Sequence, residues 1–333
     1  MRDPIAASFA RHKMEVRNID VAGSGAGSRV YHVVTDHESF AVKVALYPER
    51  RDQVIREFEI RRRLVEQGLD FVPRPHWTDE ELFRNGASIY EYVSGEPLEC
   101  DGSADEKTLH RIAGTLAELH ALDLRVIPNG FQMAEELLGR VKVLVRKTVD
   151  EHERLVNDEL RDGLSRAVRE VGDKLHECRS AFTIGLVGRC HDDVAGNIVV
   201  GEDGKLWLVD WENSCVEDIV EEMVSVSTEL NLPEDRALVL FERYQALFPA
   251  AREVDFIAMS RAYDIPTPIC NICYSIDFLD VNLRHALDPN RYADALVGVA
   301  ESTRGSMADS ISGLLIQGAV KTARRAAALA RQV

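Results

Sequence analysis

Two short segments of the chain carry the side chains that a metal-assisted reaction needs. One reads Cys190-His191-Asp192-Asp193-Val194-Ala195-Gly196-Asn197, and the other reads Leu208-Val209-Asp210-Trp211-Glu212. Carboxylate and amide oxygens are the hard ligands that Mg²⁺ prefers, and a remaining carboxylate could accept the proton of a hydroxyl group. Either segment alone could be a loop with capping acids. Together and in this order, they predict a site for metal binding and proton transfer.

A glycine-rich turn near the N-terminus could bind phosphate. It reads Gly23-Ser24-Gly25-Ala26-Gly27-Ser28 and lies between two predicted strands. Without side chains in the way, its backbone N–H groups can approach phosphate oxygens closely. A flexible hairpin turn is the alternative, and no Lys-Ser or Lys-Thr follows as it would in a Walker A loop.

Lys43 lies in the apolar run Ala41-Val42-Lys43-Val44 of a predicted strand. An ammonium group is costly to bury unless it meets an anion, although strand alternation could instead place it on the solvent face. Glu57, on the Val54 side of the next predicted helix, is the expected partner. Glu59 is the alternative.

Hydrophobic periodicity and turn residues predict the elements that would position these groups. Strands are expected over residues 17–22, 29–34, 40–46, 71–73 and 87–93, with one helix over 51–67. Residues 94–97 are predicted as a turn and as the boundary between two lobes. Beyond it, a capping box at 103–106 begins a helix, residues 135–177 form one or two helices, a hairpin joins 197–200 to 206–209, and 218–333 is mainly helical.

Composition excludes several classes of protein. The 333 residues include 40 basic and 56 acidic side chains, for a net charge of −16, which argues against a nucleic-acid partner. No long apolar run or apolar leader is present, so we expect no membrane span and no signal peptide. Six cysteines in so long a chain fit a reducing, cytoplasmic location.

Taken together, these features resemble the aminoglycoside phosphotransferase and choline kinase type of small-molecule kinase. Members of that family read as a glycine-rich loop, a strand lysine, a helix glutamate, H-x-D…N and D-W-E. The corresponding parts here are residues 23–28, Lys43, Glu57, 191–197 and 210–212, with further matches at 72–74, 90–98 and 116–122. The resemblance covers residues 16–224, and the last hundred residues match no family pattern.

The resemblance implies an α+β, bilobal protein kinase-like fold. Residues 1–93 would form a small β-rich N-lobe with one main helix, and 94–333 a larger, mainly helical C-lobe. The implied activity is transfer of the γ-phosphoryl group of ATP, with Mg²⁺, to a hydroxyl of a small molecule bound between the catalytic loop and the C-terminal helices. Acids in that region, such as Asp264, Asp277 and Asp280, would favour a cationic, aminoglycoside- or choline-like acceptor.

The resemblance also assigns roles to single residues. Lys43 would hold the α- and β-phosphates, and Glu57 would orient it. The nucleotide would further contact the phosphate loop (Gly23, Gly25, Gly27, Ser28) and the hinge backbone from Glu91 to Val93, whereas Asn197 and Asp210 would bind Mg²⁺.

The catalytic aspartate is either Asp192 or Asp193. The usual spacing of five residues before the asparagine selects Asp192, whereas the H-x-D pairing selects Asp193 and leaves the loop one residue short. We favour Asp193, because more of the local pattern is kept. In the following segment, Glu222 stands in for an aspartate that the family usually has.

Other readings stay open alongside this one. A catalytically inactive nucleotide-binding or scaffold protein is one alternative, and a protein Ser/Thr kinase, which would need an A-P-E segment that is absent here, is another. His120 and His191 are predicted to be structural, and Cys270 and Cys273 to be buried thiols rather than half of a zinc site. The acceptor, the choice between ATP and GTP, and the oligomeric state do not follow from the sequence.

Overall fold

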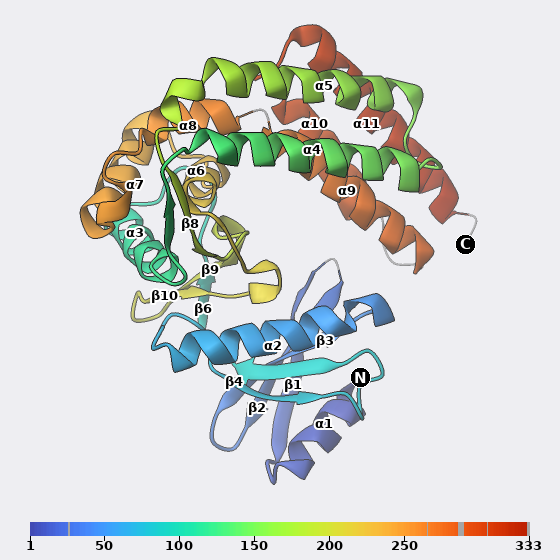
Figure 1. The fold of residues 1–333 in the computed structure, drawn as a ribbon. Helices are drawn as coiled ribbons and strands as arrows, with labels where there is room; N and C mark the ends of the chain where they lie inside the picture. The colour runs from blue at the N-terminus through green and yellow to red at the C-terminus, as the bar shows by residue number, and fades with distance from the viewer. Residues whose placement is uncertain (26, 265, 286–289, 305, 332–333) are drawn as a thin grey trace. The chain divides into compact units, whose positions relative to one another are not determined.

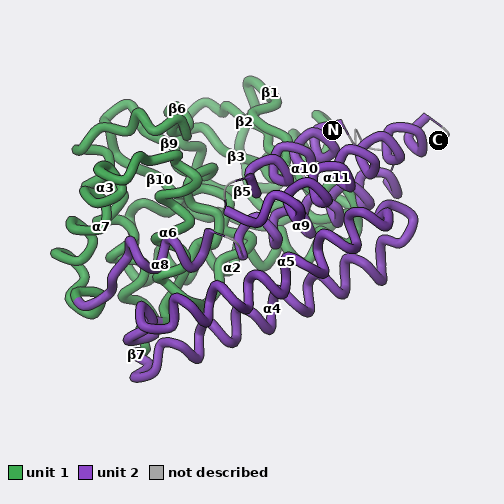
Figure 2. The backbone as a smooth tube through the Cα atoms, turned by 90° about the horizontal axis from the view of Figure 1, so that it is seen from above, with its two compact units in different colours: residues 1–125, 187–252 green, residues 126–186, 253–333 purple. Residues whose placement is uncertain are grey.

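The computed structural model describes residues 1–25, 27–264, 266–285, 290–304 and 306–331. Its chain forms two compact units (Figure 2): unit 1 comprises Met1–Arg125 and Val187–Arg252, and unit 2 comprises Val126–Leu186 and Glu253–Val333. These units do not coincide with the predicted lobes, since residues 94–125 and 187–252 belong to the same unit as the N-terminal sheet. The lobe boundary at residue 93 therefore stays a prediction.

Unit 1 begins with a five-stranded antiparallel sheet in the order β1-β2-β3-β5-β4 (Figure 1). Apolar side chains of its strands alternate into a core with Phe40 and Ile89, both fully buried. Phe9 of an N-terminal helix joins this core, with its ring centroid 5.0 Å from that of Phe40. That helix was not predicted, because it buries only two large apolar side chains. The elements are α1 (Arg2–Arg11), β1 (Val16–Ser24), β2 (Ser28–Thr35), β3 (Ser39–Ala45), η1 (Pro48–Arg50), α2 (Arg51–Glu66), β4 (Pro75–Asp79) and β5 (Ala87–Glu91).

Two short segments of unit 1 differ from their predicted structure. Residues 71–73 form no strand, because Phe71 and Val72 bury their side chains in an irregular segment and the strand begins only at Pro75. Residues 94–97, predicted as a turn, contain strand β6 (Gly95–Pro97), which pairs with β9 (Ile198–Gly201). Pro97 is tolerated because β6 is an edge strand.

The rest of unit 1 supports the two chemistry-bearing segments. The predicted hairpin is confirmed as β9 and β10 (Leu206–Leu208). The helix that comes after β6 in the chain is capped by Asp105 rather than Ser103, since the Asp105 side chain accepts a hydrogen bond from the Thr108 N–H. The remaining elements are α3 (Glu106–His120), β8 (Gly185–Cys190), η3 (Ala195–Asn197), η4 (Trp211–Asn213), β11 (Cys215–Asp218), α6 (Ile219–Glu229), α7 (Glu234–Leu247) and η5 (Pro249–Ala251). The chain passes between the units three times, within β7 (Arg125–Ile127), within β8 and after Arg252.

Unit 2 is helical, as the sequence predicts. The charged stretch after residue 130 forms two helices, and the C-terminal region adds four more within the described residues. They are α4 (Phe131–Glu151), α5 (Asp158–Glu177), α8 (Phe256–Tyr263), α9 (Pro266–Arg284), α10 (Asn290–Ser302) and α11 (Asp309–Ala330), with a 3₁₀ turn η2 (Arg179–Ala181). Among the described residues, no helix combines the length and the apolar character that crossing a membrane requires.

Helices α5 and α11 approach closely at a glycine. A Cβ placed on Gly318 would lie 2.6 Å from the Cα and Cβ atoms of Leu160, closer than side chains pack. Gly313, in the same helix, has no such neighbour within 4 Å. Gly318 thus sets the spacing of the two helices, whereas Gly313 does not.

We predict opposite effects for alanine at these two positions. Gly318→Ala should lower the free energy of unfolding by about 1–3 kcal/mol, because the added methyl group forces the helices apart. Gly313→Ala should raise it by about 0.5–1 kcal/mol, because alanine loses less backbone entropy in a helix. Urea denaturation of both variants measures the difference, and equal effects would contradict this account of the packing.

Candidate active site

The buried ammonium group of Lys43 gathers three carboxylates. Its Nζ lies 2.8 Å from Glu57 Oε2, 2.6 Å from Asp210 Oδ1 and 2.8 Å from Glu212 Oε2. Burial alone would lower the pKa of Lys43, but the carboxylates of Glu57, Asp210 and Glu212 outweigh it and raise the pKa. The structure thus brings Lys43, Glu57 and Asp210 together, as the sequence suggested. It adds Glu212, whose contact with the lysine had not been expected.

Glu57 connects the lysine to α2 and to the D-W-E segment. While Oε2 faces Lys43, Oε1 accepts a hydrogen bond from the Trp211 N–H at 3.0 Å and pairs with the guanidinium of Arg61. Glu59, the alternative partner, instead pairs with the exposed Arg62. Glu57 is completely buried, and the contacts of its two oxygens fix the orientation of the carboxylate.

Arg61 is a buried cation that sequence reasoning did not identify as part of the site. Its side chain is 1% exposed, and the guanidinium carbon lies 3.6 Å from the ring centroid of Tyr90 in β5. The pair of Glu57 and an arginine four residues later on one helix face was the available signal. Arg61 balances the charge of Glu57 independently of Lys43.

Asp210 lies two residues after the end of β10, in the segment that the sequence predicts to bind a metal ion. Asp210 adopts a left-handed backbone conformation, with φ of 61°, immediately before η4. Burial alone would raise its pKa, but the Lys43 ammonium group outweighs burial and lowers the pKa. Asp210 is therefore ionised at neutral pH and able to bind a cation.

The catalytic-loop residues Asp193 and Asn197 lie together. The Asn197 side-chain amide donates to the backbone oxygen of Asp193 at 2.7 Å, which leaves the amide oxygen as the atom suited to a metal ion. Desolvation by the surrounding loop raises the pKa of Asp193, and the Asp210 carboxylate raises it further, although the residue still reaches solvent.

Asp192 lies elsewhere in the loop. Its carboxylate gathers with Cys215 and Glu217 on β11 rather than with Asp210. Its backbone has a φ of 84°, a strained value for a residue other than glycine. This arrangement supports the choice of Asp193 as the base, a role that stays a prediction.

Glu222 of α6 supports the predicted catalytic loop through hydrogen bonds to both of its oxygens. Its Oε1 accepts hydrogen bonds from the N–H groups of His191 and Asp192, at 2.7 and 2.6 Å. Its Oε2 meets His120 Nε2 at 2.5 Å, and His120 Nδ1 meets the Tyr244 hydroxyl at 2.7 Å. Glu222 thus supports the loop, although the family that the sequence resembles usually has an aspartate at this position.

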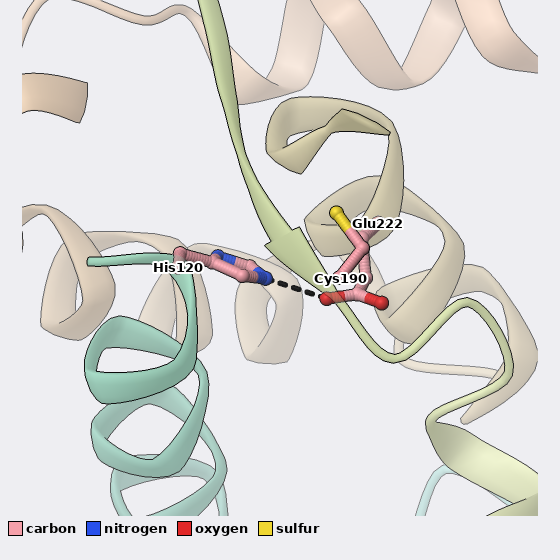
Figure 3. Close-up of side chains that lie close together, drawn as sticks. All are labelled: His120, Cys190 and Glu222. Carbon is pink, nitrogen blue, oxygen red and sulfur yellow. Dashed lines mark hydrogen bonds and ion pairs between the residues drawn. The ribbon is translucent and has the colours of Figure 1, made fainter. Parts of the chain in front are cut away.

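Cys190 lies near enough to His120 and Glu222 for the three to hold a metal ion (Figure 3). Both ring nitrogens of His120 and both oxygens of Glu222 already have hydrogen-bond partners, so a structural role accounts for the cluster. His191 is also structural, since its Nε2 donates to the Val209 carbonyl at 2.8 Å.

The glycine-rich turn and the hinge occupy the two ends of the sheet strands that flank Lys43. Gly23 lies in β1, Ser28 begins β2, and the Gly25 N–H donates to the Ser28 carbonyl at 2.9 Å. Gly27 lies in the same turn, and Ala26 lies outside the described residues. In the hinge, the Glu91 N–H donates to the Arg74 carbonyl at 2.8 Å.

The donor set suits a divalent cation. Oxygen atoms of Glu57, Asp210 and Glu212 lie within 4.8 Å of one another. Hard oxygen ligands of this kind fit Mg²⁺ rather than a soft metal. Lys43 lies among them, so a metal ion would share these carboxylates with its ammonium group.

We predict that Glu222→Ala destabilises the chain strongly. The change leaves two N–H groups, that of His191 buried and that of Asp192 partly buried, and the buried His120 without their acceptor. This should lower the free energy of unfolding by about 3–5 kcal/mol. Glu118→Ala, at an exposed position of α3, is the control and should change it by less than about 0.5 kcal/mol. Urea denaturation would contradict the bracing role if both variants unfolded alike.

Glu229 supplies a pH-dependent prediction. Burial and the neighbouring Asp193 carboxylate raise the pKa of Glu229 from 4.5 to about 8. The native state therefore keeps a proton that the unfolded state loses, so this group makes stability fall as pH rises between those two values. Glu229→Gln should be more stable than the native chain at pH 9 and equally stable near pH 4. Thermal unfolding at both pH values tests this, and a constant difference would count against it.

Comparison with known proteins identifies the family. A sequence model described as the phosphotransferase enzyme family matches residues 18–256. A search of curated proteins finds no match. The match spans both segments described above and most of the chain.

Solved structures share the fold at low sequence identity. Choline kinase LicA from Streptococcus pneumoniae is 17% identical with a TM-score of 0.60, covering 90% of this chain and 99% of its own. Spectinomycin phosphotransferase APH(9)-Ia, solved with ADP and spectinomycin, is 13% identical with a TM-score of 0.60, covering 94% and 97%. Macrolide 2'-phosphotransferase MphH from Brachybacterium faecium is 15% identical with a TM-score of 0.57, covering 88% and 98%.

These likenesses confirm the predicted α+β, protein kinase-like fold, with an antiparallel N-terminal sheet and a larger helical part. With the family match over residues 18–256, they show that the chain is a member of the phosphotransferase enzyme family.

Proposed function

We propose that the protein transfers the γ-phosphoryl group of ATP to a hydroxyl of a small molecule. The observation that carries this proposal is the meeting of Lys43 with Asp210, 167 positions apart in sequence, at 2.6 Å. A lysine for phosphates beside a metal-binding aspartate is the arrangement that kinase-type phosphoryl transfer requires.

Each residue of the site has a separate role in the proposed reaction. Lys43 would bind the α- and β-phosphates while Glu57 keeps its ammonium group in place. Asp210 and Asn197 would hold Mg²⁺, which neutralises charge on the phosphates. Asp193 would orient the acceptor hydroxyl and take its proton as the oxygen bonds to the γ-phosphorus. The bond from that phosphorus to the bridging oxygen then breaks, and ADP leaves.

The hinge supports binding of a nucleotide base. Within the described chain, neither the N–H nor the carbonyl of Val93 takes part in a hydrogen bond, so both can serve a ligand. Structures of LicA with AMP and of APH(9)-Ia with ADP are among the neighbours. We propose adenine as the base, and a cytoplasmic location, where ATP is available, belongs to the same proposal.

The acceptor is a small alcohol in this proposal. Two of the acids expected to favour a cation already have side-chain partners inside unit 2. Asp280 Oδ1 accepts from Arg154 Nε at 2.8 Å, and Asp277 lies 3.3 Å from His152 Nε2. Asp264 is exposed. Choline-like and aminoglycoside-like compounds are therefore proposed as acceptors from the neighbours named above rather than from these charges.

We predict that Asp193→Asn lowers kcat by about 10²–10⁴-fold, because the general base is lost. Asp192→Asn, the neighbouring control, should keep kcat within about threefold of the native chain. The assay measures ADP release with aminoglycosides, macrolides, choline, homoserine and sugars. If the native chain binds Mg·ATP but releases ADP with no acceptor, and neither substitution changes this, a nucleotide-binding protein without catalysis replaces the proposal.

A further inference from the structure

Arg50 joins the glycine-rich turn to the start of α2. It is the last residue of η1, and its side chain is 13% exposed. A Cβ built on Gly27 would lie 2.7 Å from both the Cγ and the Cδ of Arg50. The absence of a side chain at residue 27 is therefore what leaves room for the arginine beneath the turn.

The Arg50 guanidinium is held on several sides. Nε donates to the Tyr47 hydroxyl at 3.0 Å, and Nη1 also donates to the Gln53 side chain. Nη1 lies 3.2 Å from Glu212 Oε1. These contacts direct the positive charge toward the D-W-E segment instead of into solvent.

Glu212 is shared between two cations. Its Oε1 faces Arg50, while its Oε2 lies 2.8 Å from Lys43 Nζ. A single carboxylate thus spans the ammonium and guanidinium groups. A phosphate group also presents two oxygens to two cations, and guanidinium groups bind phosphate through paired N–H donors.

We infer that Arg50 is a second phosphate-binding cation of the nucleotide site, contacting the β-phosphate, alone or together with the γ-phosphate, beside Lys43. This inference rests on the proposed function, since it places a nucleotide at Lys43. In it, a phosphate group replaces Glu212 between the two cations. Glu212 is then released from Lys43, which leaves its carboxylate available to a divalent cation beside Asp210.

The charges around the site are consistent with this exchange. The residues that these ion pairs join are three acids (Glu57, Asp210 and Glu212) and three bases (Lys43, Arg50 and Arg61). Arg61 stays with Glu57, which is fully buried, whereas Arg50 is partly exposed at the glycine-rich turn. Of the two arginines, Arg50 is therefore the one that a phosphate can reach.

The test compares ligands that differ only in their phosphates. Adenosine, AMP, ADP and a non-hydrolysable ATP analogue, the last two with Mg²⁺, are titrated by calorimetry into the full chain and into Arg50→Met. We expect binding of ADP and of the ATP analogue to weaken by about 10- to 100-fold, because a charge-assisted contact is lost. The affinity for adenosine should stay within twofold, and Arg50→Lys should recover part of the loss.

Arg51→Met is the matched control. Arg51 is the next residue, its side chain is 45% exposed, and it pairs with Glu80 rather than with the site. This variant should bind all four ligands as the native chain does. In the kinetic assay, Arg50→Met should raise KM for ATP by more than it lowers kcat.

Two results overturn the inference. One is an ADP affinity within twofold of native in Arg50→Met, and the other is an equal loss for adenosine and ADP, which would assign Arg50 a purely structural role. If Arg50→Met does not fold, Arg50→Lys decides by the same comparison. Lys43→Met separates this inference from the proposed function. If Lys43→Met leaves the ADP affinity unchanged, the nucleotide does not bind at Lys43 and the proposed function fails. If Lys43→Met lowers the ADP affinity and Arg50→Met does not, only the role of Arg50 is rejected.

Discussion

Burial of one ammonium group inside a β-sheet is the constraint on which unit 1 depends. Lys43 lies in the central strand β3, and its side chain is 2% exposed. Such a charge is tolerated only with close counter-ions. The counter-ions come from α2 and from the segment after β10, so satisfying the lysine also fixes the helix and the D-W-E segment against the sheet.

The same electrostatic logic extends outward from the lysine. Arg61 pairs with the other oxygen of Glu57, so that Glu57 has two cationic partners and not Lys43 alone. Glu222 carries its charge beside His120 and the N–H group of His191, and so supports the predicted catalytic loop through contacts that do not include Lys43. Glu57 and Glu222 therefore each connect elements that are distant in sequence.

The sequence predicted the parts of this site that have a local pattern. Lys43 stood out as a charge in an apolar strand, and Asp210 followed a recognisable hairpin. Glu212 was missed as a partner of Lys43, because their contact joins elements that are far apart in the chain. Arg61 was missed although its spacing from Glu57 was visible in the sequence, because its burial against Tyr90 depends on the packing of the helix on the sheet. Strand β6 was missed for a similar reason, since its three residues contain glycine and proline and pair only through β9. The sequence pattern thus identified the main polar residues of the site, but not the full set of ion pairs that neutralises their charges.

The left-handed backbone at Asp210 has a consequence for anyone who builds an inert form of the protein. Aspartate and asparagine adopt this conformation with little strain, whereas alanine or a β-branched residue does not. If an alanine at position 210 abolished turnover, the loss could come from the missing carboxylate or from a displaced main chain, and the two causes could not be separated. A nucleotide-trapping version should accordingly carry asparagine at this position, so that the chemistry is removed while the shape of the segment is preserved.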